Sequence, residues 1–298
     1  MTGLSKALAA WEKLFGRLQS VVIGVVHLHA LPGTPRNSKS IQEIVDVACK
    51  EANIYFKHGV DAVIVENSHD IPYVKHPHIG PEITSYVTRV CAEIRRQFPK
   101  KPIGVQVLAG GNAEALAIAH ACGLNFIRAE GFVYTAVADE GIIDACAGPL
   151  LRMRKHIGAE NVMILADIKK KHSAHTITSD LTIQNVAQGA EFCLADGVII
   201  TGIMTGKQPD PQEAAVTQRV VSIPVLFGSG VTTENLHAFI GDANGLIVGS
   251  DFKVDGKMLN DLDEKRVEKF MKAVAKLRDT VVDENSAKKT KPTTTFIG

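Results

Sequence analysis

The sequence predicts a single (β/α)8 barrel of the phosphate-binding type, an α/β fold. Short apolar runs rich in valine and isoleucine alternate with longer helical patterns eight times between residues 20 and 282. Strands that are covered by helices on both faces have this continuous apolar character. A length of 298 residues, 45% of them hydrophobic, suits one large barrel. A doubly wound open sheet would carry a glycine-rich turn after its first strand, whereas His27–Gly33 contains no dinucleotide fingerprint.

Each predicted strand is followed by a segment with helical periodicity, which indicates parallel pairing through crossover helices. The strands are expected at Val21–Val26, Ala62–Val65, Ile103–Leu108, Phe126–Ala129, Val162–Ala166, Val198–Ile200, Pro224–Phe227 and Leu246–Val248. The helices are expected near residues 41–58, 82–97, 113–122, 142–157, 180–194, 212–220, 233–240 and 262–280.

The two ends of the chain differ from the barrel. Residues 1–19 predict an amphipathic helix packed on the barrel, because large apolar residues recur there at steps of three and four. These residues are Leu4, Leu8, Trp11, Phe15 and Leu18. An organelle-targeting presequence is the alternative interpretation of this segment, and Glu12 argues against it. Residues 283–298 are rich in lysine, threonine and serine and predict a disordered tail.

Composition excludes some classes of binding partner and favours one cellular compartment. A net charge of +1 and 5% aromatic residues argue against nucleic acid as the main partner. No apolar run approaches 18 residues, so no transmembrane helix is expected. Peripheral membrane association through the N-terminal helix stays open. Five widely spaced cysteines and no secretory signal predict buried thiols in the cytoplasm, with mitochondrial or plastid import left open.

The active site of a barrel lies at the C-terminal ends of its strands, and reactive residues gather there. Charged side chains on apolar strands are costly unless they are paired, and residues two apart share a face. We therefore expect pairs of Arg128 with Glu130 and of Asp167 with Lys169. The catalytic candidates at these strand ends are Glu66, Glu130, Asp167, Lys169 and His172.

The turns after the seventh and eighth strands predict a phosphate site. Ser229 and Gly230 follow one strand, and Gly249 and Ser250 follow the next. Glycine lets backbone N–H groups approach an anion, and the helix expected after residue 232 would add its N-terminus. Two long loops, Asn67–Pro81 and Thr201–Lys207, could cover the mouth.

The histidines at the end of the first strand raise a metal hypothesis. His27 and His29 are two apart and would leave the strand on the same face. With Glu130 and Asp251 they would form a site for a divalent metal such as zinc or manganese. In the alternative, His29 caps a turn while His27 hydrogen-bonds Glu66 or Asp167.

Several of these segments together resemble the BtpA family. They are Ile23–Gly33, Asp61–Asn67, Ala166–Lys169, Thr201–Gly206 and Gly228–Val231, within a likeness that spans residues 20–280. The resemblance implies a barrel similar in pattern to the ribulose-phosphate-binding barrels. The family takes its name from a role in photosystem I biogenesis as an extrinsic membrane-associated protein. It supplies no catalytic residues to carry over.

Two shorter likenesses concern the chemistry. Asp167-Ile-Lys169 resembles the start of the Asp-x-Lys-x-x-Asp signature of the orotidine-phosphate decarboxylase group, with His172 in place of the second Asp. His27-Leu-His29 is similar to the first metal motif of amidohydrolases, although Thr201 stands where that family has a ligand histidine.

The function expected from these features is acid–base chemistry on a small phosphorylated sugar or related metabolite. The reaction would be isomerisation, epimerisation or carbon–carbon lysis, in a homo-oligomer. Asp167 or Glu66 would be the base, and Lys169 would stabilise the developing oxyanion or return the proton. A metal-dependent hydrolase of the amidohydrolase type and a non-catalytic, membrane-associated assembly factor are the two alternatives.

Overall fold

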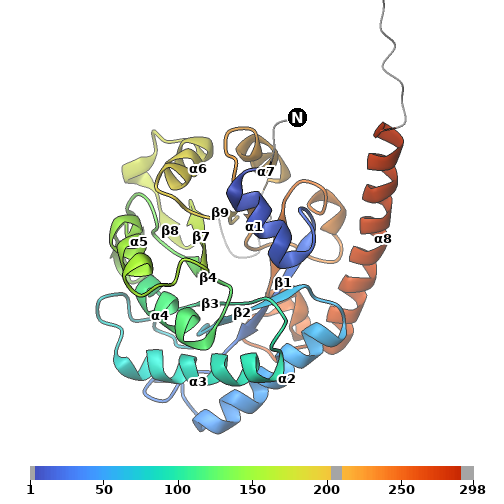
Figure 1. Cartoon of the computed structure of the whole chain (residues 1–298). Coiled ribbons are helices and arrows are strands. Elements are labelled where there is room, and N and C mark those ends of the chain that lie inside the picture. Colours follow the sequence, from blue (N-terminus) through green and yellow to red (C-terminus); the bar gives the residue numbers. More distant parts are fainter. Residues whose placement is uncertain (1–3, 203–209, 290–298) are drawn as a thin grey trace, which may run out of the picture.

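Eight parallel strands close into a barrel in the computed structural model, which describes residues 4–202 and 210–289 (Figure 1). The strands are β1 (Val21–His27), β2 (Ala62–Glu66), β3 (Ile103–Gln106), β4 (Phe126–Ala129), β7 (Met163–Ile168), β9 (Gly197–Ile200), β10 (Val225–Phe227) and β11 (Gly245–Val248). Each strand pairs with its neighbours in chain order, and β11 closes the ring on β1. The predicted barrel and all eight of its strands are confirmed.

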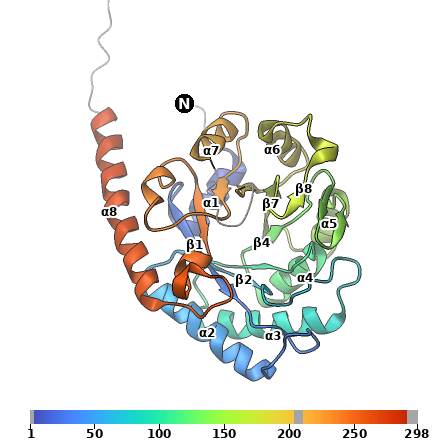
Figure 2. The same cartoon turned by 180° about the vertical axis from the view of Figure 1, so that it is seen from behind.

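Helices surround the barrel, as the alternating pattern predicts (Figure 2). They are α2 (Ile41–Lys57), α3 (Pro81–Gln97), α4 (Asn112–Cys122), α5 (Ala147–His156), α6 (Ile183–Phe192), α7 (Pro211–Gln218) and α8 (Glu264–Lys289). The short 3-10 turns are η1 (Thr176–Thr178), η2 (Leu236–Ala238), η3 (Ser250–Phe252) and η4 (Val254–Gly256). Helix α8 continues past residue 283, and the remainder of the predicted tail, from residue 290, lies outside the described residues.

Two expected helices differ from the prediction. The segment near 233–240 forms only the 3-10 turn η2, because the Asn235 side chain accepts from the Thr232 N–H and donates to the Gly230 carbonyl. Such local side-chain bonds compete with a regular helix. The helix expected near 142–157 starts only at residue 147, because residues 142 and 143 belong to β6 (Gly141–Ile143). This strand forms a hairpin with β5 (Ala136–Ala138), which also pairs with β8 (Ser173–Ala174).

The interior of the barrel is filled by the inward-facing residues of the strands. Because side chains alternate along a strand, every second residue of β1 faces inward, from Val21 to His27. Phe126 fills the centre, where a Cβ on Gly104 of the neighbouring strand would lie only 2.2 Å from its ring. The strand end beyond this apolar layer is the open mouth of the barrel.

The N-terminal helix α1 (Lys6–Phe15) closes the opposite end of the barrel (Figure 1). Ser5 caps the helix by accepting from the Leu8 N–H, and Gly16 ends it in the left-handed region. Trp11 and Phe15 are buried in the barrel's inner apolar cluster, with their ring centroids 4.2 Å apart. The predicted packing of this helix is confirmed. No helix of the described residues is long and apolar enough to cross a membrane.

Candidate active site

The mouth of the barrel gathers the expected charged residues at one end. His27 and Glu66 end neighbouring strands and lie opposite each other in the ladder, and Glu66 in turn lies opposite Gln106. Arg128 and Asp167 face the same interior from β4 and β7. All eight strands are parallel, so their carboxyl ends form one rim of the barrel. The residues named above lie on this rim together with Glu130 and Ser250.

Arg128 and Asp167 form a buried ion pair across neighbouring strands. The Arg128 Nε lies 3.0 Å from one carboxylate oxygen of Asp167 and 3.1 Å from the other. Burial lowers the pKa of Arg128, but the carboxylates of Asp167 and Glu66 outweigh it and raise that pKa overall. Asp167 is therefore held by Arg128, and the expected pair of Asp167 with Lys169 does not form.

Glu130 is held by three donors instead of by Arg128. Its carboxylate accepts from the Lys170 ammonium at 2.6 Å, the Gln106 amide at 3.0 Å and the Gly110 N–H at 2.8 Å. The expected pair with Arg128 fails because β4 ends at Ala129, so strand alternation no longer sets where Glu130 points. A cavity of about 40 Å³ beside Glu130, Asp167 and Lys170 has room for a few water molecules.

Lys169 and His172 lie outside the centre of the mouth. Strand β7 ends at Ile168, and Lys169 takes a positive φ of 45°, so the strand alternation that would have turned it inward is lost. Its ammonium donates to the carbonyl of Leu181. His172 also has a positive φ, of 58°, and its side chain is exposed.

The sequence interpretation missed Lys170, which pairs with Glu130, and Lys171. The Lys171 backbone N–H donates to the Thr201 hydroxyl at 2.8 Å, which fixes the loop against β9. Burial and the nearby Arg128 lower the pKa of its ammonium, while Glu66 and Asp167 act in the opposite direction. No carboxylate of the described residues forms an ion pair with it. The lysine run at 169–171 was the signal, but only the loop conformation decides which lysine faces the carboxylates.

Glu66 is the carboxylate of the mouth with the fewest partners. Its side chain is half-buried, and it accepts one hydrogen bond, from the Ser68 hydroxyl at 2.7 Å. In the described part of the chain no lysine or arginine lies within ion-pair distance of it. Glu66 and Lys171 are thus a carboxylate and an amine that share the mouth without being engaged by a salt bridge.

His27 faces the interior beside the turn after β11. A Cβ on Gly249 would lie 2.9 Å from the His27 ring, so only glycine fits there without displacing the imidazole. Burial, followed by the charge of Lys253, lowers the pKa of His27 well below its usual value. Its Nδ1 is buried with no hydrogen-bond partner, so the expected bond to Glu66 or Asp167 does not form through this atom.

The four expected metal ligands are not brought together. The Asp251 carboxylate is held by Arg266 at 2.9 Å and by Thr233, and Glu130 is held by Lys170. His29 lies in a separate pocket with His69. Within residues 4–202 and 210–289, no three His, Cys, Asp or Glu side chains are placed to hold one ion.

The two glycine turns of the expected phosphate site lie side by side, because β10 pairs with β11. Gly230 has a positive φ of 75°, and the N–H groups of Ser229 and Gly230 donate to no acceptor among the described residues. A Cβ on Gly228 would lie 3.4 Å from Arg128 Nη2, so this cation adjoins the turn. The expected helix N-terminus is missing, because η2 is a single 3-10 turn. The second covering loop falls mainly on residues 203–209, outside the described residues.

Comparison with known proteins relates the chain to relatives along nearly its full length. A Caenorhabditis elegans protein named "Uncharacterized protein F13E9.13, mitochondrial" is 49% identical over 90% of this chain and 97% of its own. "Photosystem I biogenesis protein BtpA" of Synechocystis is 35% identical over 88% of this chain and 92% of its own.

Solved structures share the barrel at low sequence identity. Tryptophan synthase of Mycobacterium tuberculosis superposes with a TM-score of 0.58 and 14% identity, covering 91% of this chain and 99% of that one. N-(5'-phosphoribosyl)anthranilate isomerase of Pyrococcus furiosus superposes with a TM-score of 0.52 and 16% identity, covering 86% of this chain and 98% of that one. These likenesses concern the fold. The model of the BtpA family matches residues 18–276, and the chain therefore belongs to the BtpA family.

Proposed function

We propose that this protein is an acid–base enzyme that isomerises, epimerises or cleaves a small phosphorylated sugar or related metabolite. The observation that carries the proposal is the placement of Glu66 and Lys171 in the mouth, neither engaged by a salt bridge in the described residues. Catalytic acids and bases are commonly groups whose pKa is shifted by their surroundings. The lowered pKa of Lys171 brings its proton affinity closer to neutral pH.

The proposed step is removal of a proton from carbon next to a carbonyl group. The Glu66 carboxylate takes the proton, and the electron pair of the C–H bond moves to form an enolate. The Lys171 ammonium stabilises the negative oxygen and can protonate it. Return of a proton to the neighbouring carbon isomerises the substrate, and return to the opposite face epimerises it. Asp167 is paired with Arg128, so Glu66, and not Asp167, is the proposed base.

The phosphate of the substrate would lie on the turns of Ser229, Gly230, Gly249 and Ser250. The backbone N–H groups of Ser229 and Gly230, which donate to none of the described residues, are donors of the kind that hold phosphate oxygens in barrels. The adjoining Arg128 guanidinium adds a positive charge. Glu66 would reach the substrate from another strand end, since β1 and β11 separate β2 from β10 in the ring.

Proton exchange with solvent tests the proposed reaction directly. The protein is incubated in D₂O with a panel of aldose and ketose phosphates, and proton NMR detects loss of the signal next to the carbonyl. We expect deuterium incorporation with the wild type and none with Glu66→Gln, whose amide cannot accept the proton. A panel in which no compound exchanges would overturn the proposal.

Substitution of Gly230 tests the phosphate site. A side chain at a φ of 75° is strained, so Gly230→Ala should displace the turn and weaken phosphate binding by about tenfold, the loss expected for one charge-assisted hydrogen bond. Gly158→Ala is the matched control, because Gly158 has a φ of 72° and lies far along the chain, after α5. Calorimetric titration with a sugar phosphate measures both. Equal affinities in the two variants would contradict the site.

The name of the Synechocystis relative, a photosystem I biogenesis protein, supports a second candidate, the non-catalytic, membrane-associated assembly factor that the family resemblance implies. In this chain the large apolar residues of α1, Trp11 and Phe15, are turned into the barrel. We therefore expect no flotation with liposomes of anionic lipid. Flotation that is lost when residues 1–19 are deleted would favour the assembly role over catalysis.

A further inference from the structure

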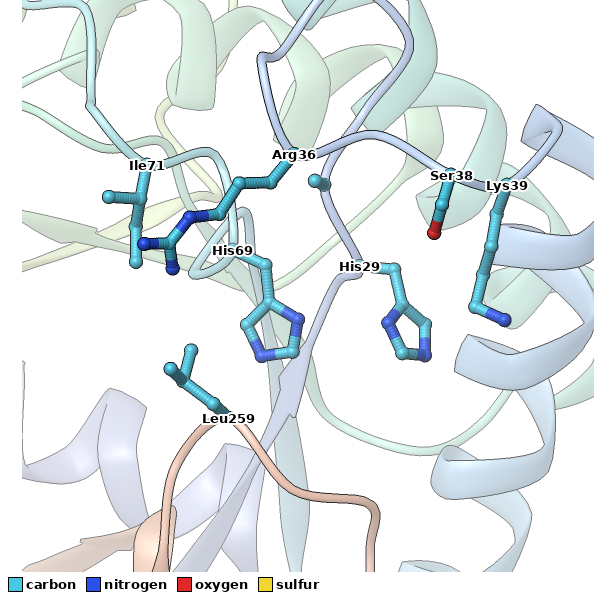
Figure 3. Close-up of a pocket in the computed structure, with 8 residues that line it drawn as sticks. His29, Arg36, Ser38, Lys39, His69, Ile71 and Leu259 are labelled. Carbon is cyan, nitrogen blue, oxygen red and sulfur yellow. The ribbon is translucent and has the colours of Figure 1, made fainter.

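A second pocket, of about 180 Å³, opens outside the ring of mouth residues. It lies between the loops after β1 and β2 and the segment that contains Leu259 (Figure 3). Figure 3 shows the Arg36 guanidinium beside His69 and Ile71, and the Lys39 side chain next to His29. One water molecule needs roughly 10–15 Å³ of such space, so the pocket admits a much larger group.

Two permanent cations line this pocket without a partner of opposite charge. Neither Arg36 nor Lys39 forms an ion pair within the residues that the structure describes. An arginine fork and a lysine ammonium are the side chains that proteins use to bind phosphate and carboxylate oxygens. The Ser38 hydroxyl, also in the lining, is a further donor.

Two histidines complete the donor set. The rings of His29 and His69 meet edge to face, with centroids 5.4 Å apart. Burial is the largest cause that lowers the pKa of both histidines. The charges of His69, Lys39 and Lys253 lower the pKa of His29 further, and the charge of Lys253 lowers that of His69. A neutral imidazole still offers one N–H donor. The negative charge of Asp261 raises the pKa of both histidines.

The acid nearest to His69 in sequence is already engaged. Asp70 accepts from the Leu31 N–H at 2.7 Å, the Thr34 hydroxyl at 3.0 Å and the Asn67 amide at 3.0 Å. Beneath the histidines, Lys253 is buried and paired with Glu51 at 2.6 Å. Of the pocket's own lining, every ionisable side chain is a histidine, an arginine or a lysine.

We propose that this pocket, lined by His29, Arg36, Lys39 and His69, is a binding site for the phosphoryl group of a small ligand. Ile71 and Leu259 are the large apolar side chains of the lining, beside the two cations and the two imidazoles. The site is separate from the glycine turns in its residues, since none of Ser229, Gly230, Gly249 and Ser250 lines this pocket. It does not depend on the proposed reaction.

Histidine NMR with inorganic phosphate as the probe tests this site. The imidazole signals of His29 and His69, assigned with His29→Asn and His69→Asn, should shift together as phosphate is added. Arg36→Gln and Lys39→Gln should each weaken the apparent affinity by about tenfold, the loss of a charge-assisted hydrogen bond. Lys100→Gln is the matched control: this exposed lysine follows α3 at the opposite end of the barrel, and its removal should leave the affinity unchanged.

Further results decide the proposal. Phosphate that shifts neither imidazole signal, or an affinity that falls equally in Lys100→Gln, would overturn it. Unchanged shifts in Gly230→Ala would show that this pocket binds phosphate independently of the glycine turns and so support it. A sugar phosphate that moves both histidine signals more strongly than inorganic phosphate would identify the group as part of a metabolite. Loss of proton exchange in Glu66→Gln tests the proposed reaction and does not test phosphate binding in this pocket.

Discussion

Replacing Lys171 by methionine should lower the rate of substrate proton exchange by about 100- to 10,000-fold, the usual contribution of a general acid or base. Methionine keeps most of the apolar stem and removes the ammonium group, whose charge interacts with those of Arg128 and Glu66. Circular dichroism and the melting temperature should stay close to those of the wild type, which separates a loss of chemistry from a loss of fold.

Lys169→Met is the matched control for this experiment. Lys169 is two residues away, but its ammonium donates to the Leu181 carbonyl on the loop before α6. We expect a rate within a few fold of the wild type. Equal losses in the two variants would mean that the loop, and not the Lys171 amine, supports the reaction.

The pH dependence gives an independent signature of Lys171. The acid form of the amine exists below its pKa, and burial together with Arg128 lowers that pKa in the folded protein. The rate should therefore fall as the pH rises through a value below the 10.4 of an ordinary lysine. Nitrogen-15 NMR of labelled lysines should show one early-titrating signal that is missing in Lys171→Met. A profile that declines only at the ordinary lysine value would contradict this assignment.

Replacing Trp11 by alanine should lower the free energy of unfolding by about 3–5 kcal/mol, the range for removing a large aromatic side chain from a core. Trp11 is fully buried, and its ring stands 3.2 Å from where a Cβ of Gly245 in β11 would lie. Its loss would leave a cavity at the closed end of the barrel. Phe15, which contacts both Trp11 and the cluster around Phe126, would lose its neighbour.

Leu4→Ala is the control on the same segment, because Leu4 is 50% exposed and should change stability by no more than about 0.5 kcal/mol. Urea unfolding followed by circular dichroism measures both variants, since Trp11 is the chain's single tryptophan and its fluorescence is lost with it. Equal stability of Trp11→Ala and wild type would show that α1 does not support the barrel.

The order and type of the main elements could be predicted from the chain itself. Continuous apolar runs between helical segments indicate buried parallel strands, and their alternation places His27, Glu66 and Asp167 on the inward face at one end. The spacing of Trp11 and Phe15 likewise predicts a helix with one buried face. These features depend on local periodicity, which a sequence carries directly.

The partners of the charged residues were decided only by the tertiary structure. Arg128 pairs with Asp167 because β4 and β7 are neighbours in the ring, although the two residues are 39 positions apart. Beyond the strand ends periodicity no longer applies. The loop that begins with a positive φ at Lys169 pairs Lys170 with Glu130 and leaves Lys171 without an ion pair among the described residues. The pocket of His29, Arg36 and His69 has the same origin, because three loops remote in sequence meet there only when the barrel closes.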